Sequence, residues 1–297
     1  MRSALFIGAI AGLAACSFSA VGASQDAIST TDSSVLDSRP ADARTDARSD
    51  APPPPPQKRT TRGLVLRYDF NELAAGNIIA DVSGVGVPAN LMVGPLPTNS
   101  VMPTTDGTAL TTTSPNVLID APASDAGAKI AAACGAGVLS LEIWMQQTPG
   151  NLSYGRLFSF GSSADLGFRN VQVGTTADDN IAGFMRSARS TTAGQAVDIV
   201  DAVDVTQQQL VVMRYGNGAL KADIYSGESH KNATIALAGD FSTWSNLYKL
   251  VLLNSNRHFD NQDSRYWLGS IFSMSVYCAI LSDTEIANDR LLGAESL

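Results

Sequence analysis

The sequence has few of the residues that build metal and redox sites. Its 297 residues include three cysteines and two histidines, His230 and His258, and neither histidine lies at a ligand-like spacing from a cysteine. After the first 16 residues, no apolar run reaches the roughly 18 to 20 residues that are needed to cross a bilayer. These absences argue against a cysteine–histidine metal centre and exclude a polytopic membrane protein.

Basic side chains are also scarce in the body of the chain. Residues 63–297 carry 22 acidic and 13 basic residues, a formal charge of −9. Such a surface repels nucleic-acid phosphates and anionic lipid headgroups, so we expect no nucleic-acid partner. Because 44% of the chain is hydrophobic, it has enough apolar material for a large core, which excludes disorder throughout.

The N-terminus has the features of an export signal. Arg2 precedes an apolar stretch over residues 4–15, and the stretch ends in Leu13-Ala14-Ala15-Cys16. These four residues resemble the bacterial lipobox, which implies cleavage after residue 15 and lipidation of Cys16. The serine at position 17 then favours sorting to the outer membrane. The alternative is an ordinary signal peptide that is cut elsewhere and leaves an unmodified cysteine.

A tether is predicted between this signal and the body. Residues 16–62 are rich in Ser, Thr, Asp, Ala and Pro, a composition that buries too little apolar area to offset the entropy of ordering. The five prolines at 52–56 favour a stiff polyproline II spacer. A binding motif for proline-recognition domains is the alternative, although such partners are mainly cytosolic.

The body, residues 63–297, has the alternating pattern of an all-β domain. In short segments, apolar and polar residues alternate, and residues typical of turns separate these segments. This pattern predicts a two-sheet antiparallel sandwich. Asn217-Gly218 is typical of a tight hairpin, because both residues accept positive φ angles. The nine predicted strands cover residues 64–70, 139–145, 156–160, 166–173, 181–186, 209–215, 219–225, 248–254 and 270–278.

One short helix is predicted near the C-terminus. Ser282 stands three residues before Glu285, the spacing of a capping box in which each side chain accepts from the other residue's backbone N–H. Ile286, Leu291 and Leu292 provide apolar contacts to the sandwich.

The order of these segments resembles the LamG-like jellyroll domains of the concanavalin A-like lectin and glucanase superfamily. The resemblance covers nearly all of residues 63–297 and implies a jellyroll sandwich. The last strand departs from the pattern at Phe272 and Ser273, where many relatives have an acidic pair, and residues 95–113 are expected to form an irregular insertion. The matching pieces are Tyr68-Asp69-Phe70-Asn71-Glu72, Asp81-Val82-Ser83-Gly84, Leu141-Glu142-Ile143-Trp144, the segment 157–161 that ends in Gly161, and the segment 269–277 followed by the helix start.

The resemblance favours a binding module over an enzyme. Catalytic relatives carry a Glu-x-Asp-x-Glu strand, which is absent here, and Glu142 is the single acidic residue of its strand. We therefore expect a non-catalytic adhesion or binding domain whose partner is a glycan or an envelope protein. Two alternatives remain: a glycosidase whose carboxylates converge from distant segments, and a structural domain that contacts other envelope proteins.

Two sets of candidate site residues follow. Planar rings and amides suit a sugar, and the segment that holds them suggests Asn254, Asn256, Arg257, His258 and Trp267 as ligand-binding residues. Packing inside the sandwich is the alternative for Trp267, and it is the interpretation that we favour for Trp144.

Some relatives bind Ca²⁺ through loop oxygens, which makes Asp69, Glu72 and Asp81 candidate metal ligands. The alternative is that these are solvated turn carboxylates, with Asp81 capping its own turn.

With Cys16 assigned to lipid, Cys134 and Cys278 remain. An even number of remaining cysteines in an exported chain suggests that the two form one disulfide. The alternative is that both are buried and reduced.

Overall fold

The computed structural model describes residues 58–71, 77–94, 101–103, 109–112, 119–121, 125–135, 137–149, 155–161, 169–176, 180–190, 194–199, 207–244, 248–253 and 265–294. The chain divides into two units, Met1–Pro53 and Pro54–Leu297, and every described residue lies in the second. The predicted signal, Cys16 and the tether up to residue 57 lie outside the described residues.

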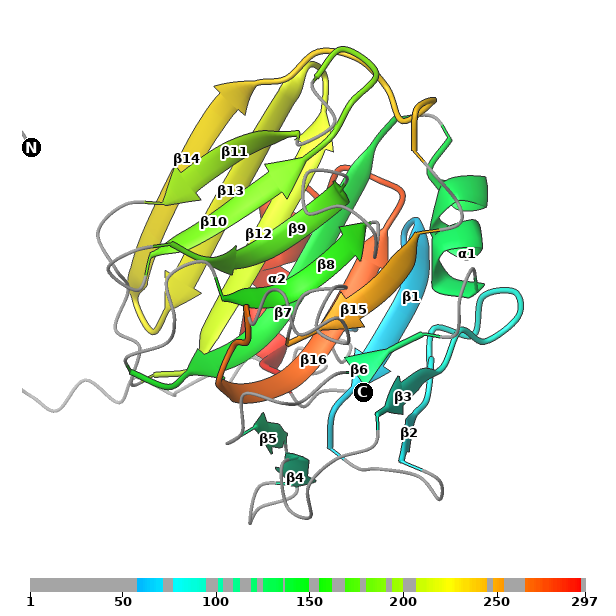
Figure 1. Ribbon diagram of the computed structural model, residues 1–297. Helices are drawn as coiled ribbons and strands as arrows, with labels where there is room; N and C mark the ends of the chain where they lie inside the picture. Colours follow the sequence, from blue (N-terminus) through cyan, green and yellow to red (C-terminus); the bar gives the residue numbers. More distant parts are fainter. Residues whose placement is uncertain are drawn as a thin grey trace, which may run out of the picture. The chain divides into compact units, whose positions relative to one another are not determined.

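The described residues form two eight-stranded antiparallel sheets, which confirms the predicted all-β sandwich (Figure 1). In sheet A the strand order is β14-β13-β12-β7-β16-β5-β4, and β1 also pairs with β16. Its strands are β1 (Leu64–Asp69), β4 (Val101–Pro103), β5 (Leu110–Thr112), β7 (Leu139–Gln147), β12 (Gln209–Gly216), β13 (Ala219–Ser226), β14 (Ser229–Ala236) and β16 (Gly269–Tyr277).

Sheet B has the order β11-β10-β9-β8-β15-β6-β3-β2. Its strands are β2 (Ile78–Ile79), β3 (Leu91–Val93), β6 (Ile119–Asp120), β8 (Arg156–Gly161), β9 (Arg169–Thr175), β10 (Ile181–Met185), β11 (Gln195–Ile199) and β15 (Lys249–Leu252). All nine predicted strands overlap observed ones.

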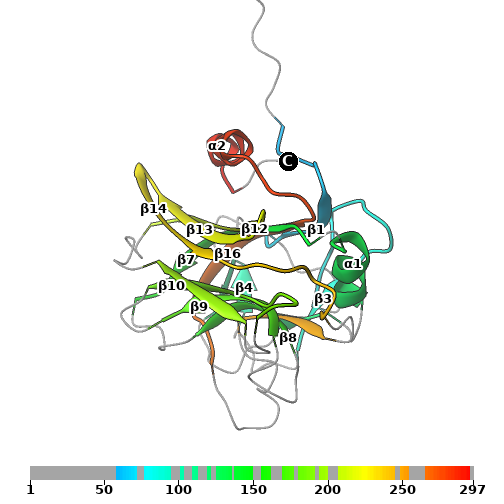
Figure 2. The ribbon, with the colours of Figure 1, turned by 90° about the horizontal axis from the view of Figure 1, so that it is seen from above.

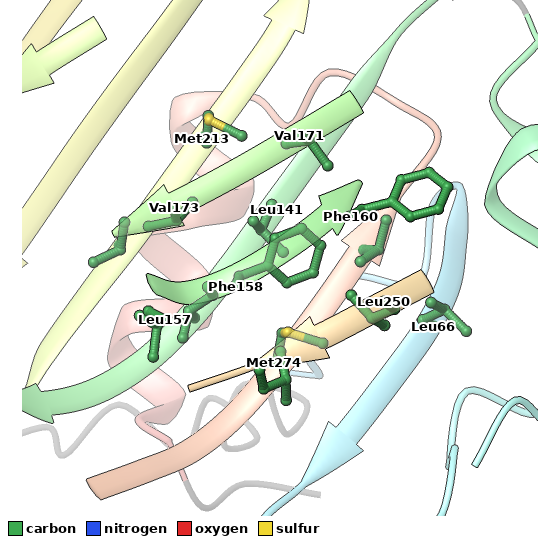
Figure 3. Packing of buried hydrophobic residues seen from close by; sticks show 14 of the residues in the cluster. Leu66, Leu141, Leu157, Phe158, Phe160, Val171, Val173, Met213, Leu250 and Met274 are labelled. Carbon is green, nitrogen blue, oxygen red and sulfur yellow. The ribbon is translucent and has the colours of Figure 1, made fainter. Parts of the chain in front are cut away.

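The core lies between the two sheets, as the alternating pattern predicts. In β7, Leu141 and Ile143 point into the core cluster, and Glu142 between them belongs to the opposite face of the sheet. Figure 3 shows inward side chains of both sheets in contact, with Phe158 and Phe160 of β8 near Met274 and Leu250.

Local sequence signals are confirmed at two places. Asn217 and Gly218 have φ angles of 54° and 76°, and they join β12 to β13 as a two-residue hairpin loop. Helix α2 (Asp283–Leu292) has Ser282 as its N-cap, and the capping box with Glu285 is complete.

Helix α2 lies on the outside of sheet A, away from the core (Figure 2). The N-terminal strap, which we define as residues 59–62, crosses this helix. The backbone N–H of Thr60 donates to Asp289 over 3.1 Å, and Arg62 forms an ion pair of 2.7 Å with Glu285. The guanidinium of Arg59 donates to the carbonyl of Gly293 just after the helix. The helix is therefore held between the sheet and the strap.

Several elements were not predicted. Helix α1 (Asp125–Ala133) was missed because its buried residues, Ala126, Gly127 and Ile130, are mostly small and form only a weak apolar stripe. Strand β14 was missed because nearly all of its residues are exposed, so it lacks the alternating signal. Strands β4 and β5 lie inside the segment that was expected to be irregular.

The predicted disulfide is present and joins the end of α1 to the end of β16. Cys134 directly follows the helix, Cys278 directly follows the strand, and their Cα atoms are 4.7 Å apart. Neither of the two helices among the described residues has the length and apolar character needed to span a membrane.

Candidate ligand-binding pocket

The outer face of sheet A carries a row of large side chains from three neighbouring strands. Trp144 of β7 pairs in register with Leu210 of β12, and Leu210 pairs with Tyr225 of β13. Side chains alternate along a strand, so the core position of Ile143 places Trp144 on this outer face. Trp144 and Leu210 belong to a second apolar cluster, which also contains Ile286 of α2.

A pocket of about 710 Å³ opens between this row and α2. Its volume falls in the range of small-molecule sites, roughly 300 to 1,000 Å³. The walls come from the sheet, from the residues before β12, from the β13–β14 turn and from α2. The lining residues are Trp144, Gln207, Gln208, Tyr225, Gly227, Glu228, Ala287, Arg290, Leu291 and Gly293.

The pocket contains polar groups that the protein itself leaves unused. Trp144 is 8% exposed, and its indole Nε1 has no hydrogen-bond partner within the described part of the chain. Gln207, Gln208 and Glu228 also line the pocket, and among the described residues their side chains make no hydrogen bond. The Trp144 N–H is itself covered by the protein, so the hydrogen-bonding groups that a ligand can reach are the side chains of Gln207, Gln208 and Glu228.

The floor at Tyr225 is held in place from two sides. Its ring stacks on the ring of His230 with centroids 4.2 Å apart, and the guanidinium carbon of Arg290 lies 4.4 Å from the Tyr225 centroid. Arg290 also donates to the carbonyl of Gly227 over 3.1 Å and so connects α2 to the β13–β14 turn. Burial, with a contribution from the charge of Asp223, raises the pKa of Tyr225 to about 12, so its hydroxyl is neutral at pH 7.

A buried network supports this floor from the side. The carboxylate of Asp223 accepts from His230 over 2.9 Å and forms ion pairs with Arg214 at 2.8 Å and Lys221 at 3.0 Å. Arg214 in turn contacts Asp283, the first residue of α2, over 2.7 Å. The network therefore fixes His230, and the helix start, relative to the sheet.

Two buried carboxyl groups meet beneath α2, next to the pocket. Glu142 and Asp289 are 1% and 0% exposed and lie within hydrogen-bonding reach of each other. Glu142 accepts from the Tyr277 hydroxyl over 3.0 Å, and Asp289 accepts from the backbone of Thr60. Burial, strengthened by the charge of Asp289, raises the pKa of Glu142 to about 8, and burial also raises the pKa of Asp289.

This pair bears on the glycosidase alternative, which requires carboxylates that converge in an open cleft. Glu142 and Asp289 do converge from distant segments, but they lie between a sheet and a helix and have almost no exposed surface. Their position gives a substrate no access to them.

Of the candidate metal ligands, Asp81 and Asp69 each bind other groups of the protein. The Asp81 carboxylate accepts from the backbone of Ser83 over 3.0 Å and of Ala89 over 3.1 Å, and it forms an ion pair of 2.5 Å with Lys129. Burial opposes ionisation, but these hydrogen bonds outweigh it and lower the pKa of Asp81 below its ordinary value. Its bond to Ser83 is the turn cap that the sequence offered as the alternative.

Asp69 forms an ion pair of 3.2 Å with Arg67, and Glu72 lies outside the described residues. Within the described ranges, no three His, Cys, Asp or Glu side chains are grouped as a metal site requires.

The candidate sugar-binding residues have a different outcome. Asn254, Asn256, Arg257 and His258 lie outside the described residues, so their role stays a prediction. Trp267 is 1% exposed and belongs to the cluster between the sheets, where packing was the alternative.

The pocket itself was missed by sequence reasoning, because its lining comes from segments far apart in the chain. One signal was available: the alternation in β7 places Trp144 opposite Ile143, and therefore outside the core.

No family model matches the chain, and no curated protein is found as a relative. Among solved structures, the botulinum neurotoxin serotype C1 binding domain has a TM-score of 0.51 at 12% identity, over 79% of this chain and 52% of that chain. The chain thus spans about half the length of that domain. This likeness supports the two-sheet sandwich fold.

Two further structures are more distant. Ruminococcus gnavus IT-sialidase CBM40 bound to alpha2,3 sialyllactose has a TM-score of 0.41 at 20% identity, over 50% of this chain and 80% of that chain. A botulinum neurotoxin type C structure, described as depending on two ganglioside molecules for cell entry, has a TM-score of 0.47 at 11% identity, over 77% of this chain and 51% of that chain.

Proposed function

We propose that this protein is a non-catalytic glycan-binding module of the LamG-like type, and that the pocket beneath α2 is its binding site. The observation that carries the proposal is the pocket of about 710 Å³ between sheet A and α2, which has the free amides of Gln207 and Gln208 in its lining. Sugars present hydroxyl groups around flat, weakly apolar ring faces. Apolar surface from Ala287 and Leu291, with the amides of Gln207 and Gln208 in the same lining, matches both features.

The chemistry of the lining also favours a neutral or weakly charged ligand. Arg290 and Glu228 bring one charge of each sign, and the guanidinium of Arg290 is already engaged with Gly227 and Tyr225. Gln207 and Gln208 each offer a donor and an acceptor, which suits the mixed hydrogen bonding of a sugar hydroxyl. With no carboxylate pair open to a substrate among the described residues, the proposed role is binding without hydrolysis.

The test is a glycan array probed with the purified full chain, with sialyllactose and ganglioside headgroups among the probes. Each hydrogen bond contributes about 1 kcal/mol net, or somewhat under tenfold in affinity. Gln207→Ala/Gln208→Ala should therefore weaken binding of any hit by about tenfold or more. Leu291→Ala, which removes exposed apolar surface from the pocket lining, should weaken it several-fold.

Gln195→Ala is the matched control, because Gln195 is an exposed glutamine on β11 of the other sheet. The glycan affinity of this variant should equal that of the unmodified chain. A folded chain that binds no glycan on the array would disprove the proposed function. Binding that survives both pocket variants would move the site elsewhere on the molecule.

We also propose that the chain is an exported lipoprotein, anchored in the outer membrane through a lipid on Cys16. The support is the coincidence of an apolar stretch, small residues and a cysteine at residues 4–16. Two or more acyl chains hold a protein on a bilayer stably, whereas one does not. Residues 17–62 would then act as the spacer between membrane and jellyroll.

Mass spectrometry of the native protein tests the anchor directly. An N-terminal fragment that begins at Cys16 and carries acyl chains is the expected result. Cys16→Ser should move the protein from the membrane fraction to the soluble fraction. An unmodified Cys16 in the native protein would contradict the anchor.

A further inference from the structure

The carboxyl pair beneath α2 leaves two buried oxygen atoms without a hydrogen-bond partner: Oε1 of Glu142 and Oδ2 of Asp289. Two ionised carboxylates at hydrogen-bonding distance repel each other strongly in a buried site. A single proton between the two groups removes the repulsion and gives both orphaned oxygens a partner. The geometry therefore calls for one proton to be shared by the pair.

We propose that Glu142 and Asp289 share one proton, and that this proton holds α2, and with it one wall of the ligand pocket, against sheet A. Glu142 lies on β7 two residues before Trp144, and Asp289 directly precedes Arg290 on α2. The pair therefore joins the two elements that carry opposite sides of the pocket. Its effect on ligand affinity rests on the proposed function, but its effect on α2 does not.

The surroundings set the charge balance of the pair. From β16 the Tyr277 hydroxyl donates to Glu142, and β12 presents the apolar Val212, which pairs in register with Glu142. The strap contributes the positive charge of Arg59, and β1 contributes the more distant charge of Arg67. With one shared proton, the single negative charge of the pair is balanced by Arg59.

Loss of the proton unbalances the site. Both carboxylates are then negative, and Arg59 offsets one of them. Glu142 has an ordinary pKa of 4.5 when exposed and a pKa of about 8 when α2 is in place. Between pH 4.5 and pH 8, the packing of α2 against sheet A therefore takes up one proton. The stabilisation of α2 by this proton is complete below pH 4.5 and is lost as the pH rises through 8.

Hydrogen exchange of the α2 amides in the full chain tests this coupling. After correction for the intrinsic rate, protection of residues 286–292 should fall by about tenfold for each pH unit between 5 and 8. Glu142→Gln keeps a neutral group that can donate to Asp289, so its α2 protection should not depend on pH in this range. Protection in the unmodified chain that stays constant from pH 5 to 8 would overturn the proposal.

Asp283→Asn is the matched control on the same helix. The Asp283 side chain is 80% exposed and pairs with Arg214, which lowers its pKa, so it is ionised throughout this pH range. This variant should keep the pH dependence of the unmodified chain. Loss of the dependence in Asp283→Asn would show that general surface charge, and not the buried pair, controls α2.

The pocket wall has its own readout. With 5-fluorotryptophan incorporated, the fluorine resonance of Trp144, assigned by its absence in Trp144→Phe, should shift with the same pH dependence as α2 protection. In Glu142→Gln it should stay fixed, and a pH-dependent shift there would contradict the coupling. If Glu142→Gln does not fold, Asp289→Asn serves instead. Removing the neighbouring charge should weaken the pH dependence, because the burial of Glu142 remains, and an unchanged dependence in this variant would contradict the shared proton.

These outcomes separate the two proposals. A negative glycan array together with pH-dependent α2 protection removes the proposed function and leaves the shared proton. Glycan binding with pH-independent protection removes the shared proton and leaves the function.

Discussion

At the scale of single residues, the two buried tryptophans Trp144 and Trp267 have different roles. Trp267 packs between the sheets, and Trp144 lies outside sheet A at the floor of the pocket. The Nε1 atoms of both are buried without a hydrogen-bond partner in the described part of the chain. In Trp267, that N–H is a cost of filling the core with a large ring, and in Trp144 it is a cost of packing the ring in the apolar cluster between sheet A and α2.

We expect Trp267→Ala to lower the free energy of unfolding by about 3 to 5 kcal/mol, because it leaves a large cavity in the core. Trp267→Phe should cost much less, since the lost N–H makes no hydrogen bond. Denaturant unfolding of both variants checks this order. If Trp267→Phe folded normally but lost glycan affinity, Trp267 would be a ligand-binding residue after all.

At the scale of elements, α2 is stabilised at its N-terminus by a carboxylate that serves two partners. Glu285 accepts from the backbone of Ser282 over 2.8 Å and forms an ion pair with Arg62 of the strap. The hydrogen bond from Arg62 is the largest cause that lowers the pKa of Glu285 from 4.5 to about 2. An acid whose pKa is lower in the folded chain than in the unfolded chain stabilises the fold at pH values above the unfolded pKa. For Glu285 this stabilisation disappears as the pH falls from 4.5 to 2.

We therefore expect Glu285→Gln to be less stable than the unmodified chain at pH 7 and equally stable near pH 2. Urea unfolding across this pH range measures the difference. A constant difference at every pH would mean that the charge of Glu285 does not act on stability.

At the scale of the whole molecule, the disulfide closes most of the sandwich into one loop. Cys134 and Cys278 are 144 positions apart in the sequence. Cross-linking so long a segment reduces the entropy of the unfolded chain, and disulfides of this kind contribute about 2 to 5 kcal/mol.

We expect Cys134→Ser/Cys278→Ser to unfold at a lower denaturant concentration by a corresponding amount. The m-value should rise or stay constant, because the unfolded chain is less restricted. The unmodified chain under reducing conditions should match the variant, and a reduced chain that is as stable as the oxidised one would contradict this account.

The secondary structure could be predicted where a local pattern was strong. The alternation in β7 and β12, the Asn217-Gly218 turn and the Ser282 capping box all depend on neighbours in the sequence, and the structure confirms each. Elements without a local signal were missed, namely an alanine-rich helix and an exposed edge strand. The candidate site was missed for a related reason, since Gln208, Tyr225 and Arg290 show no common pattern.

The sequence by itself determined the sandwich, because side-chain alternation depends only on neighbours in the chain. It suggested the disulfide between Cys134 and Cys278, but it left two reduced cysteines as an alternative, which the tertiary structure decided by bringing the two residues together. Only the tertiary structure decided which face of sheet A carries α2, where Trp144 finds open space, and that Glu142 meets Asp289. These depend on the packing of segments far apart in the chain. Burial, which sets the pKa of the acid pair, and the shape of the pocket exist only once those segments are in contact.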